Sequence, residues 1–477
     1  MSRVGFRDRV GDGTVFSSGA AVGFARLFSL VCAATQLPLL TRLLSPSEYS
    51  GVAVAIAIAT YFSLLSAEPI ILGFQRFPGS DGERFNYAHA LVWTLSTVVV
   101  VGILVLGGGF LLAHAADALA FVGWGIGIAA SRLVSTAWLM WGRPWQYAWN
   151  LMASTGTRTV VLLLLVLGGW DPLLSLAAAG LASALAAICI AHKIALGRSA
   201  WTSRPWPVSF GLNLALASLA FTGLSSGNLL LLPLFTSSER VGMYAAMTQV
   251  GALTSAAVLG LAFTVMYPKL RIAWDSGRRA AVRNYLGTFQ LAALVVALFT
   301  VFLLYVADHS LLKYVVSGKF IDGAVLAPLV MATAFAAIGQ ISSWSHQFQL
   351  EAGRVARETT TAAVIGIVTT LGLASLFKEQ GAAVGTAFGF LFYLVRMRGG
   401  THLPALITAA AVGTFVLSSV VAFVPFLSSS AVGYSALALG GATLLLIAST
   451  RKRNTGVDTP PVDCLDPGRA PSAGRVP

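Results

Sequence analysis

Long apolar stretches, separated by short segments that contain charged residues, Pro or Gly, recur from one end of this chain to the other. A helix needs about 20 consecutive apolar residues to cross the hydrocarbon core of a bilayer, and the stretches have roughly that length. Only 10% of the residues are charged and 56% are hydrophobic, whereas a soluble domain carries about 25% charged residues. A soluble fold could not bury so much apolar surface, so the sequence predicts an all-α polytopic membrane protein.

About fourteen transmembrane helices are expected, with boundaries defined to within a few residues. Residues 16–40 are longer than the apolar region of a signal peptide, which has about 7 to 15 residues, so they are interpreted as a retained first helix. Residues 361–377 and 381–396 are short and share a narrow break. The predicted spans are 16–40, 51–73, 87–113, 119–141, 149–170, 173–194, 207–235, 241–267, 287–307, 324–346, 361–377, 381–396, 403–427 and 432–449.

The positions of Lys and Arg predict the orientation, because cytoplasmic loops of membrane proteins carry the excess of positive charge. With the N-terminus inside, the outer loops hold only Arg42, Arg240, Lys313, Lys319 and Lys378, and the other loop cations collect on the inner side. Both termini, residues 1–15 and 451–477, are therefore expected in the cytoplasm. The net charge of +13 is explained by this topology, so nucleic acid is excluded as a partner. The frequent Ala, Gly, Val and Arg favour a bacterial source and the bacterial cytoplasmic (inner) membrane.

A short pattern occurs twice along the chain. Residues 47–51 and 238–242 both read Ser-Glu-x-x-Gly and follow the first and the seventh predicted helix, and an Asn-Tyr pair follows each copy at 86–87 and 284–285. Six helices separate the copies, so the pattern predicts a parallel repeat. The expected organisation is a six-helix lobe over 16–198, a second over 199–400, two helices within 401–450 and a disordered tail. Paired lobes enclose a cavity and transport by alternating access.

Three arginines lie inside predicted helices of the first lobe: Arg26, Arg132 and Arg158. At 1.5 Å per residue each lies about 14 to 15 Å from the inner end of its helix, near the middle of a core about 30 Å thick. A charged residue at that depth costs roughly 2.5 to 3.5 kcal/mol on insertion scales and marks a functional site by default. Small and polar residues surround each arginine on its helix, which favours a cavity over lipid.

Two interpretations of the arginines stay open. They form an anion site for phosphate or carboxylate, which the planar guanidinium binds with two parallel hydrogen bonds, or each locks the structure by pairing with backbone carbonyls or a buried carboxylate. The one intramembrane carboxylate expected in this lobe is Glu68, and it cannot neutralise three cations. Glu68, Asn213 and Asn228 are expected to line the cavity or its gate. For Asn213, Asn228 and Gln340, hydrogen bonds between helices or a place in the cavity lining are the two alternatives. No metal site and no cofactor is predicted; a coupling cation is left open.

Two segments resemble a known family. Residues 40–49, Leu-Thr-Arg-Leu-Leu-Ser-Pro-Ser-Glu-Tyr, and residues 241–246, Val-Gly-Met-Tyr-Ala-Ala, are similar to the polysaccharide (Wzx-type) flippases of the multidrug/oligosaccharidyl-lipid/polysaccharide exporter superfamily. The resemblance extends in layout over residues 16–449. Many members have an Asp in the seventh helix, where this chain has Gly227 and Asn228.

The resemblance implies a flippase that moves a polyprenyl-diphosphate-linked oligosaccharide from the inner to the outer leaflet. Arg26, Arg132 and Arg158 would then shield the diphosphate, membrane lipids would surround the lipid tail, and glycan-assembly enzymes would be partners. A multidrug efflux transporter of the same superfamily is the alternative, and it would place carboxylates in the first lobe. A membrane glycosyl polymerase or transferase is disfavoured, because the largest outer loop, 308–323, has few acids and bases. The chain is therefore not expected to be an enzyme.

Overall fold

The computed structural model describes residues 12–76, 115–140, 143–195, 208–261, 276–306, 310–349, 351–397 and 405–423, together with Leu270, Ala273 and Trp274. All regular elements in these residues are helices, and no strand occurs among them. Eight of the helices are long and apolar enough to cross a membrane, which confirms the predicted all-α polytopic membrane fold. The predicted spans 87–113 and 432–449, the N-terminal residues 1–11 and the tail at 451–477 lie outside the described residues.

We call the described helices of the first half of the chain the N-lobe; among them α4 packs against α2, α5 and α6, and α1 packs against α5. Glycines let two of these backbones meet: a Cβ atom on Gly127 of α4 would lie 2.4 Å from the carbonyl oxygen of Gly180 of α6. The helices of the N-lobe are α1 (Asp12–Leu43), α2 (Pro46–Arg76), α4 (Ala115–Met140), α5 (Pro144–Leu167) and α6 (Pro172–Ala195).

The second half forms the C-lobe around α12, which is buried along almost its whole length and contacts α8, α10, α13 and α14. Asp322 caps α12, because its carboxylate accepts a hydrogen bond from the Ala324 amide at 3.1 Å. The elements of the C-lobe are α7 (Val208–Leu231), η1 (Leu232–Leu234), α8 (Ser238–Leu261), α10 (Arg279–Val306), α11 (Ser310–Val315), η3 (Gly318–Phe320), α12 (Gly323–Phe348), α13 (Ala352–Met397) and α14 (Ala405–Phe423).

The predicted helices at 361–377 and 381–396 are the two arms of α13, which reverses direction at Lys378 (φ 51, ψ −128). Gly385 and Gly389 allow the arms to pack closely: a Cβ atom on Gly385 would lie 2.5 Å from the Cα atom of Thr370. The first arm begins at Ala352, earlier than predicted. The prediction missed its first turns because they contain charged residues. Glu358 in these turns is buried and accepts a hydrogen bond from Arg396 of the second arm at 2.6 Å.

The helix α2 begins five residues before the predicted span at 51–73, and a capping box explains its start. The Glu48 carboxylate accepts hydrogen bonds from the amide and the hydroxyl of Ser45, both at 2.7 Å. The Ser45 hydroxyl in turn accepts from the Glu48 amide at 3.3 Å. Glu48, one of the residues of the repeated pattern, therefore stabilises the start of α2.

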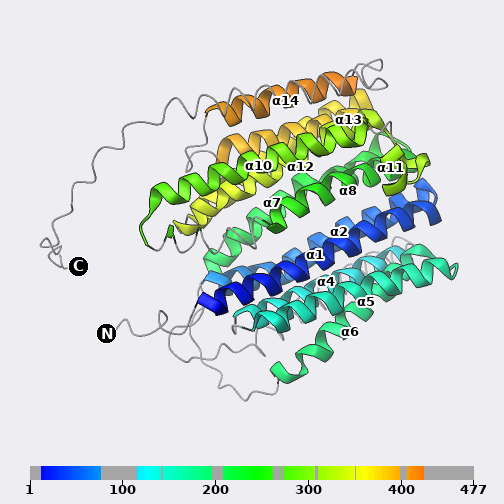
Figure 1. Cartoon of the computed structure of the whole chain (residues 1–477). Helices are drawn as coiled ribbons and strands as arrows, with labels where there is room; N and C mark the ends of the chain where they lie inside the picture. Colours follow the sequence, from blue (N-terminus) through cyan, green and yellow to red (C-terminus); the bar gives the residue numbers. More distant parts are fainter. Residues whose placement is uncertain are drawn as a thin grey trace, which may run out of the picture.

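The two lobes lie side by side, and α1 and α2 of the N-lobe face α7 and α8 of the C-lobe (Figure 1). We call the end of the bundle with the α1–α2 connection the turn end, and the end with the α12–α13 connection the far end. At the turn end the repeated pattern itself makes the contact between lobes. The backbone of Gly242 lies so close to the backbone of Pro46 that any Cβ atom would overlap the Pro46 carbonyl oxygen.

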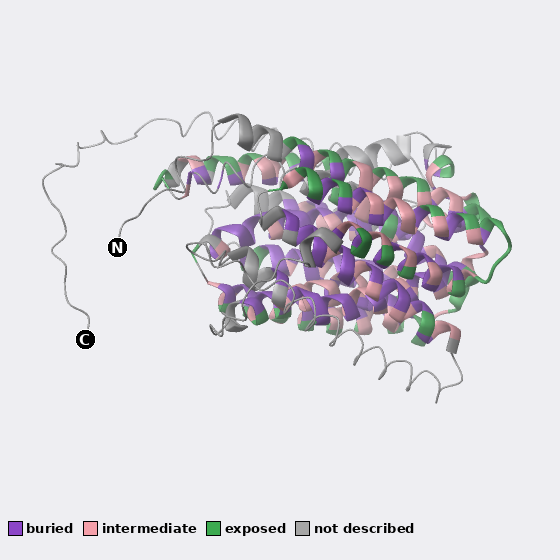
Figure 2. Ribbon diagram, turned by 90° about the horizontal axis from the view of Figure 1, so that it is seen from below, coloured by how far each residue is buried: buried purple, intermediate pink, exposed green. Residues whose placement is uncertain are grey.

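Figure 2 shows that the buried residues lie inside the bundle and the exposed ones on its outside. Many of the exposed residues have large apolar side chains. Leu185, for example, is 63% exposed, as is Val368 in the other lobe. A soluble protein does not expose so many large apolar side chains. Lipid chains therefore cover this surface.

The contact between α4 and α6 yields a prediction about stability. Gly180→Ala should lower the free energy of unfolding by roughly 1–3 kcal/mol, because its new methyl group would overlap the carbonyl oxygen of Gly123 and force the helices apart. Thermal unfolding of the purified protein in detergent measures the change. Gly372→Ala is the matched control, because Gly372 has open space around it and Ala favours a helix. Equal stability of the two variants would contradict the contact.

Candidate functional site

A cavity of about 290 Å³ lies between the two lobes, toward the far end of the bundle. Its residues come from α2 and α4 of the N-lobe and from α7, α12 and α13 of the C-lobe. The volume is at the lower end of the range of ligand pockets, roughly 300–1,000 Å³. The lining residues are Leu64, Glu68, Arg132, Leu214, Ala217, Ser218, Phe221, Thr222, Gln340, Ser343, Trp344, Gln347, Val355, Thr359 and Tyr393.

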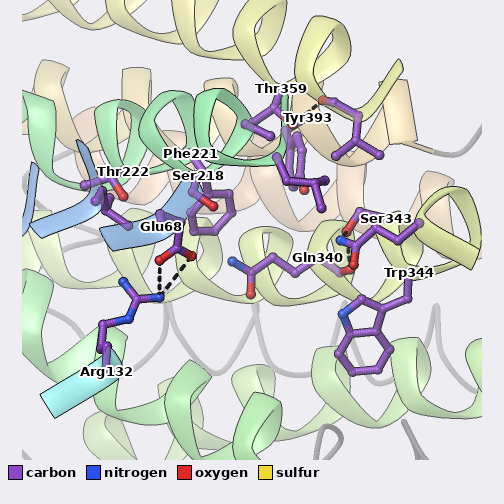
Figure 3. Close-up of a pocket in the computed structure, with 15 residues that line it drawn as sticks. Glu68, Arg132, Ser218, Phe221, Thr222, Gln340, Ser343, Trp344, Thr359 and Tyr393 are labelled. Carbon is purple, nitrogen blue, oxygen red and sulfur yellow. Dashed lines mark hydrogen bonds and ion pairs between the residues drawn. The ribbon is translucent and has the colours of Figure 1, made fainter. Parts of the chain in front are cut away.

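An ion pair on the N-lobe side supplies the charged side chains of this lining. Arg132 Nη2 of α4 donates to Glu68 Oε1 of α2 at 2.9 Å and lies 2.7 Å from Oε2 (Figure 3). The Glu68 side chain is 6% exposed, whereas the Arg132 side chain is 39% exposed. The pair therefore anchors the arginine from the protein side and leaves part of its guanidinium facing the cavity.

The exposed part of Arg132 can bind a second anion. A guanidinium has five N–H donors arranged as a fork, and only Nη2 of Arg132 contacts Glu68. Among the described residues no other carboxylate pairs with this arginine. An incoming phosphate or carboxylate oxygen can thus meet the free N–H groups while Glu68 still holds the opposite side.

The described residues that line the C-lobe side of the cavity are all uncharged. It presents amides on α12, hydroxyl groups on α7 and α13, and the rings of Phe221, Trp344 and Tyr393. Figure 3 shows the Gln340 side chain reaching from α12 toward Glu68, with Ser343 and Trp344 behind it. The two walls of the cavity therefore differ in chemistry, one being ionic and the other neutral.

Of the predicted site residues, Arg158 lies elsewhere in the N-lobe. Its guanidinium carbon is 4.7 Å from the centre of the Trp124 ring on α4. Trp124 lies about 12 Å before Arg132 along the axis of α4, at 1.5 Å per residue. Arg158, which contacts Trp124, is therefore at a different depth along the bundle from Arg132. A cation over an indole face gains roughly 2 kcal/mol when desolvated, which helps to offset the burial of the charge.

Arg26 lies on an exposed part of α1 and does not line the cavity. Ala21, Val22 and Ala25 of the same helix are buried and pack into the N-lobe. The structure therefore brings Arg132 together with Glu68, and it places Arg26 and Arg158 at separate positions in the same lobe.

The two predicted asparagines have different surroundings. Asn228 of α7 is buried and donates to the Thr386 hydroxyl of α13 at 2.8 Å and to the Tyr244 hydroxyl of α8. It ties three helices of the C-lobe together. Asn213 is half-buried on α7 beside Gly353, close to the connection between α12 and α13. Neither residue belongs to the lining of the cavity.

The residues predicted from the sequence do not include Ser343, Trp344 or Gln347, although a signal for them exists. Together with Gln340 they are spaced at three, four and seven residues along α12, which places them on one face of the helix. A stripe of amides and one indole on an otherwise apolar span is the pattern that could have identified this wall.

The turn end of the interface is closed by contacts between α1, α2 and the segment 314–320. The Ser317 amide donates to the Thr41 hydroxyl at 3.2 Å, and Arg42 donates to the Tyr314 carbonyl oxygen at 3.3 Å. The rings of Tyr49 and Phe320 meet edge to face with centroids 5.3 Å apart. These contacts join the two lobes at the turn end.

The far end carries a group of charges next to the cavity lining. The carboxylate of Glu351 contacts the buried His346 ring at 2.8 Å and Arg354 at 3.3 Å. This hydrogen bond with His346 and the nearby positive charge lower the pKa of Glu351. Among the described residues, no group of three or more His, Cys, Asp and Glu side chains could hold a metal ion.

No protein-family model and no curated protein matches the sequence of this chain. Solved structures share its fold. A structure of the lipid II flippase MurJ in an inward closed conformation has a TM-score of 0.60 and 11% identity, and the match covers 91% of this chain and 99% of that one. A crystal structure of MATE in complex with MaD3S has a TM-score of 0.59 and 14% identity, covering 84% and 96%.

An outward-facing structure of a multidrug resistance MATE family transporter of the MOP superfamily also matches, with a TM-score of 0.54, 15% identity and coverage of 84% and 96%. At these identities the likeness establishes a common fold. The arrangement of helices is thus that of MurJ and of MATE transporters, and the chain spans almost the full length of those proteins.

The ion pair yields a prediction that does not depend on any ligand. Arg132→Met should lower the stability, because it leaves the buried Glu68 carboxylate without a counterion. A loss of roughly 1–3 kcal/mol is expected, less than for a fully buried pair because Arg132 is 39% exposed. The double variant Arg132→Met, Glu68→Met should recover most of it. Thermal unfolding of the three proteins measures the coupling, and purely additive effects would show that the pair is unimportant.

Proposed function

We propose that the chain is a membrane transporter that moves a polyprenyl-diphosphate-linked oligosaccharide from the inner to the outer leaflet. The observation that carries the proposal is the position of Arg132: its guanidinium faces a cavity between two lobes that are closed against each other at the turn end. A cavity that is closed toward one end of a bundle is the arrangement that alternating access requires.

The distribution of positive charge supports the direction of transport. Arg143, Arg354, Arg357 and Arg396 lie at the far end, and cytoplasmic surfaces of membrane proteins carry the excess of Lys and Arg. The far end is then cytoplasmic, both termini are cytoplasmic, and the conformation described faces inward. The membrane is the bacterial cytoplasmic membrane, where lipid-linked glycans and the enzymes that assemble them meet the transporter.

The diphosphate is the part of such a substrate that cannot cross hydrocarbon unaided. Arg132 is the residue placed to bind it in the conformation described, through the N–H groups that do not contact Glu68. Arg26 and Arg158 add positive charge to the N-lobe at other levels, and we assign them contacts with the diphosphate as the lobes rock. The lipid tail stays in the bilayer beside the apolar outer surface.

The solved structures that share the fold support transport in general, because they are named as a flippase and as multidrug transporters. A transporter of this kind makes and breaks no covalent bonds, so we do not assign the chain a catalytic role. One observation favours the second candidate, multidrug efflux: Glu68 is a carboxylate in the cavity lining, and a carboxylate attracts cationic compounds. The two candidates differ in the sign of the charge that the cavity binds.

Two opposite substitutions distinguish the candidates. Arg132→Gln should weaken binding of undecaprenyl diphosphate carrying a sugar by about 10- to 100-fold, because a charge-assisted hydrogen bond contributes roughly 1.5–3 kcal/mol. Glu68→Gln should tighten the binding, because it frees the whole guanidinium. Titration of the purified protein in nanodiscs measures both. If the protein instead exports cations, the pattern will be reversed when the cation tetraphenylphosphonium is titrated. Glu68→Gln would then abolish tetraphenylphosphonium binding, and Arg132→Gln would not.

Exposed residues outside the cavity supply matched controls. Arg278→Gln removes an exposed arginine from the far end, and Glu239→Gln removes an exposed carboxylate from the turn end; both should leave the affinity unchanged. The triple variant Arg26→Ala, Arg132→Ala, Arg158→Ala should bind more weakly than Arg132→Ala alone. A triple variant that folds and binds no worse than Arg132→Ala would return Arg26 and Arg158 to structural roles.

A further inference from the structure

We infer that the neutral wall of the cavity, formed by Ser218, Thr222, Gln340, Trp344, Gln347 and Tyr393, is a binding site for the first pyranose ring attached to the diphosphate. The inference rests on the proposed function and adds to it the recognition of the sugar. It assigns the sugar ring of the substrate to the C-lobe and the diphosphate to the N-lobe.

The neutral wall has the functional groups that recognise a polyhydroxyl ligand. Amides and hydroxyl groups both donate and accept hydrogen bonds, as sugar hydroxyls do, and they carry no charge that would have to be neutralised. All lining residues from α7, α12 and α13 are uncharged, whereas the ion pair lies on the opposite side. This side of the cavity therefore suits a neutral ligand.

Several of these polar groups are available to a ligand. The side chains of Gln340, Ser218 and Thr222 make no hydrogen bond within the described part of the chain, although each lines the cavity. By contrast, the hydroxyl groups of Ser343 and Thr359 are satisfied by carbonyl oxygens of their own helices, both at 2.7 Å. The wall thus contains polar groups held in place by packing and others that still need a partner.

Aromatic rings complete the wall. Trp344 of α12 and Tyr393 of α13 are both buried and both line the cavity. The flat, apolar face of an indole covers the C–H face of a pyranose, while hydroxyl groups at the ring edge reach the amides beside it. Gly339 leaves room for the Tyr393 ring, because a Cβ atom there would lie 2.5 Å from it.

The arrangement of the two walls sets the orientation of the ligand. Figure 3 shows the Gln340 amide between the Glu68–Arg132 pair on one side and Ser343 and Trp344 on the other. A sugar diphosphate has an anionic end and a neutral end joined directly, so only one orientation matches both walls. A cavity of about 290 Å³ is small for a ligand pocket, and it suits one ring with its diphosphate better than a chain of sugars.

The test compares two probes that differ only in the sugar: undecaprenyl diphosphate and undecaprenyl diphosphate carrying one N-acetylglucosamine. The full-length protein in nanodiscs should bind the sugar-bearing probe at least about tenfold more tightly. The variant Gln340→Ala with Trp344→Leu should lose this difference and keep the affinity for undecaprenyl diphosphate. Gln249→Ala with Trp170→Leu is the matched control, because both residues are exposed and lie outside the cavity.

Each outcome has a separate meaning. Equal binding of both probes by the unmodified protein would overturn the inference and leave the proposed function intact, whereas binding of neither probe would overturn the proposed function. A double variant that loses both probes equally while its thermal unfolding is unchanged would also overturn the inference. Gln340→Ala alone provides the same comparison if the change at Trp344 prevents folding, with a smaller loss confined to the sugar-bearing probe.

Discussion

Hydrocarbon offers no hydrogen bond to a peptide group, and this constraint governs the whole structure. Each backbone amide and carbonyl within the bilayer must find its partner inside the same segment, which leaves the helix as the spanning element of this chain. Because the lipid is as apolar as a leucine side chain, burial of apolar surface does not hold one helix to another. Small residues do so instead, at Gly127 and Gly180 in one lobe and at Gly385 and Gly389 in the other.

The same constraint explains why the polar side chains that remain inside are so informative. Two kinds stand out among the described residues: side chains that are satisfied by a neighbour and side chains that face the cavity. Asn228 belongs to the first kind, since its amide ties α7 to α8 and α13. Arg158 has a neutral partner, the indole of Trp124. Arg132 belongs to both kinds, since Glu68 satisfies one side of it and the cavity receives the other. A difference between the lobes follows: the N-lobe supplies charge and the C-lobe supplies neutral polar groups.

The sequence predicted the helical membrane fold because the length and apolar character of a span are local properties. It could not place the arginines relative to one another. Counting residues from the ends of apolar stretches put Arg132 and Arg158 at one depth, but helices continue past those ends, as α5 does when it begins at Pro144 rather than at 149. Which side of a helix faces a neighbour depends on packing between lobes, so the pairing of Arg132 with Glu68 was not apparent.

The hairpin of α13 shows a related limit. The narrow break near Lys378 was visible in the sequence, and it does mark the reversal. The start of the first arm was missed because the charged turn with Arg354, Arg357 and Glu358 does not look like part of a membrane helix. Glu358 of this turn is paired with Arg396 of the other arm, which lies far away in the sequence but beside Glu358 in the fold. Long-range pairing of this kind has no local signature.

The closure at the turn end consists largely of backbone groups. Gly242 meets the carbonyl of Pro46, the amide of Ser317 meets Thr41, and Arg42 meets the carbonyl of Tyr314. None of these contacts pairs a cation with an anion, so separating them creates no uncompensated charge, and water can replace each hydrogen bond that is lost. Breaking these three contacts should therefore depend little on salt or pH, so any dependence of opening on ions at this end must come from Glu48 of α2 and Lys319 of the C-lobe, which attract each other across the interface.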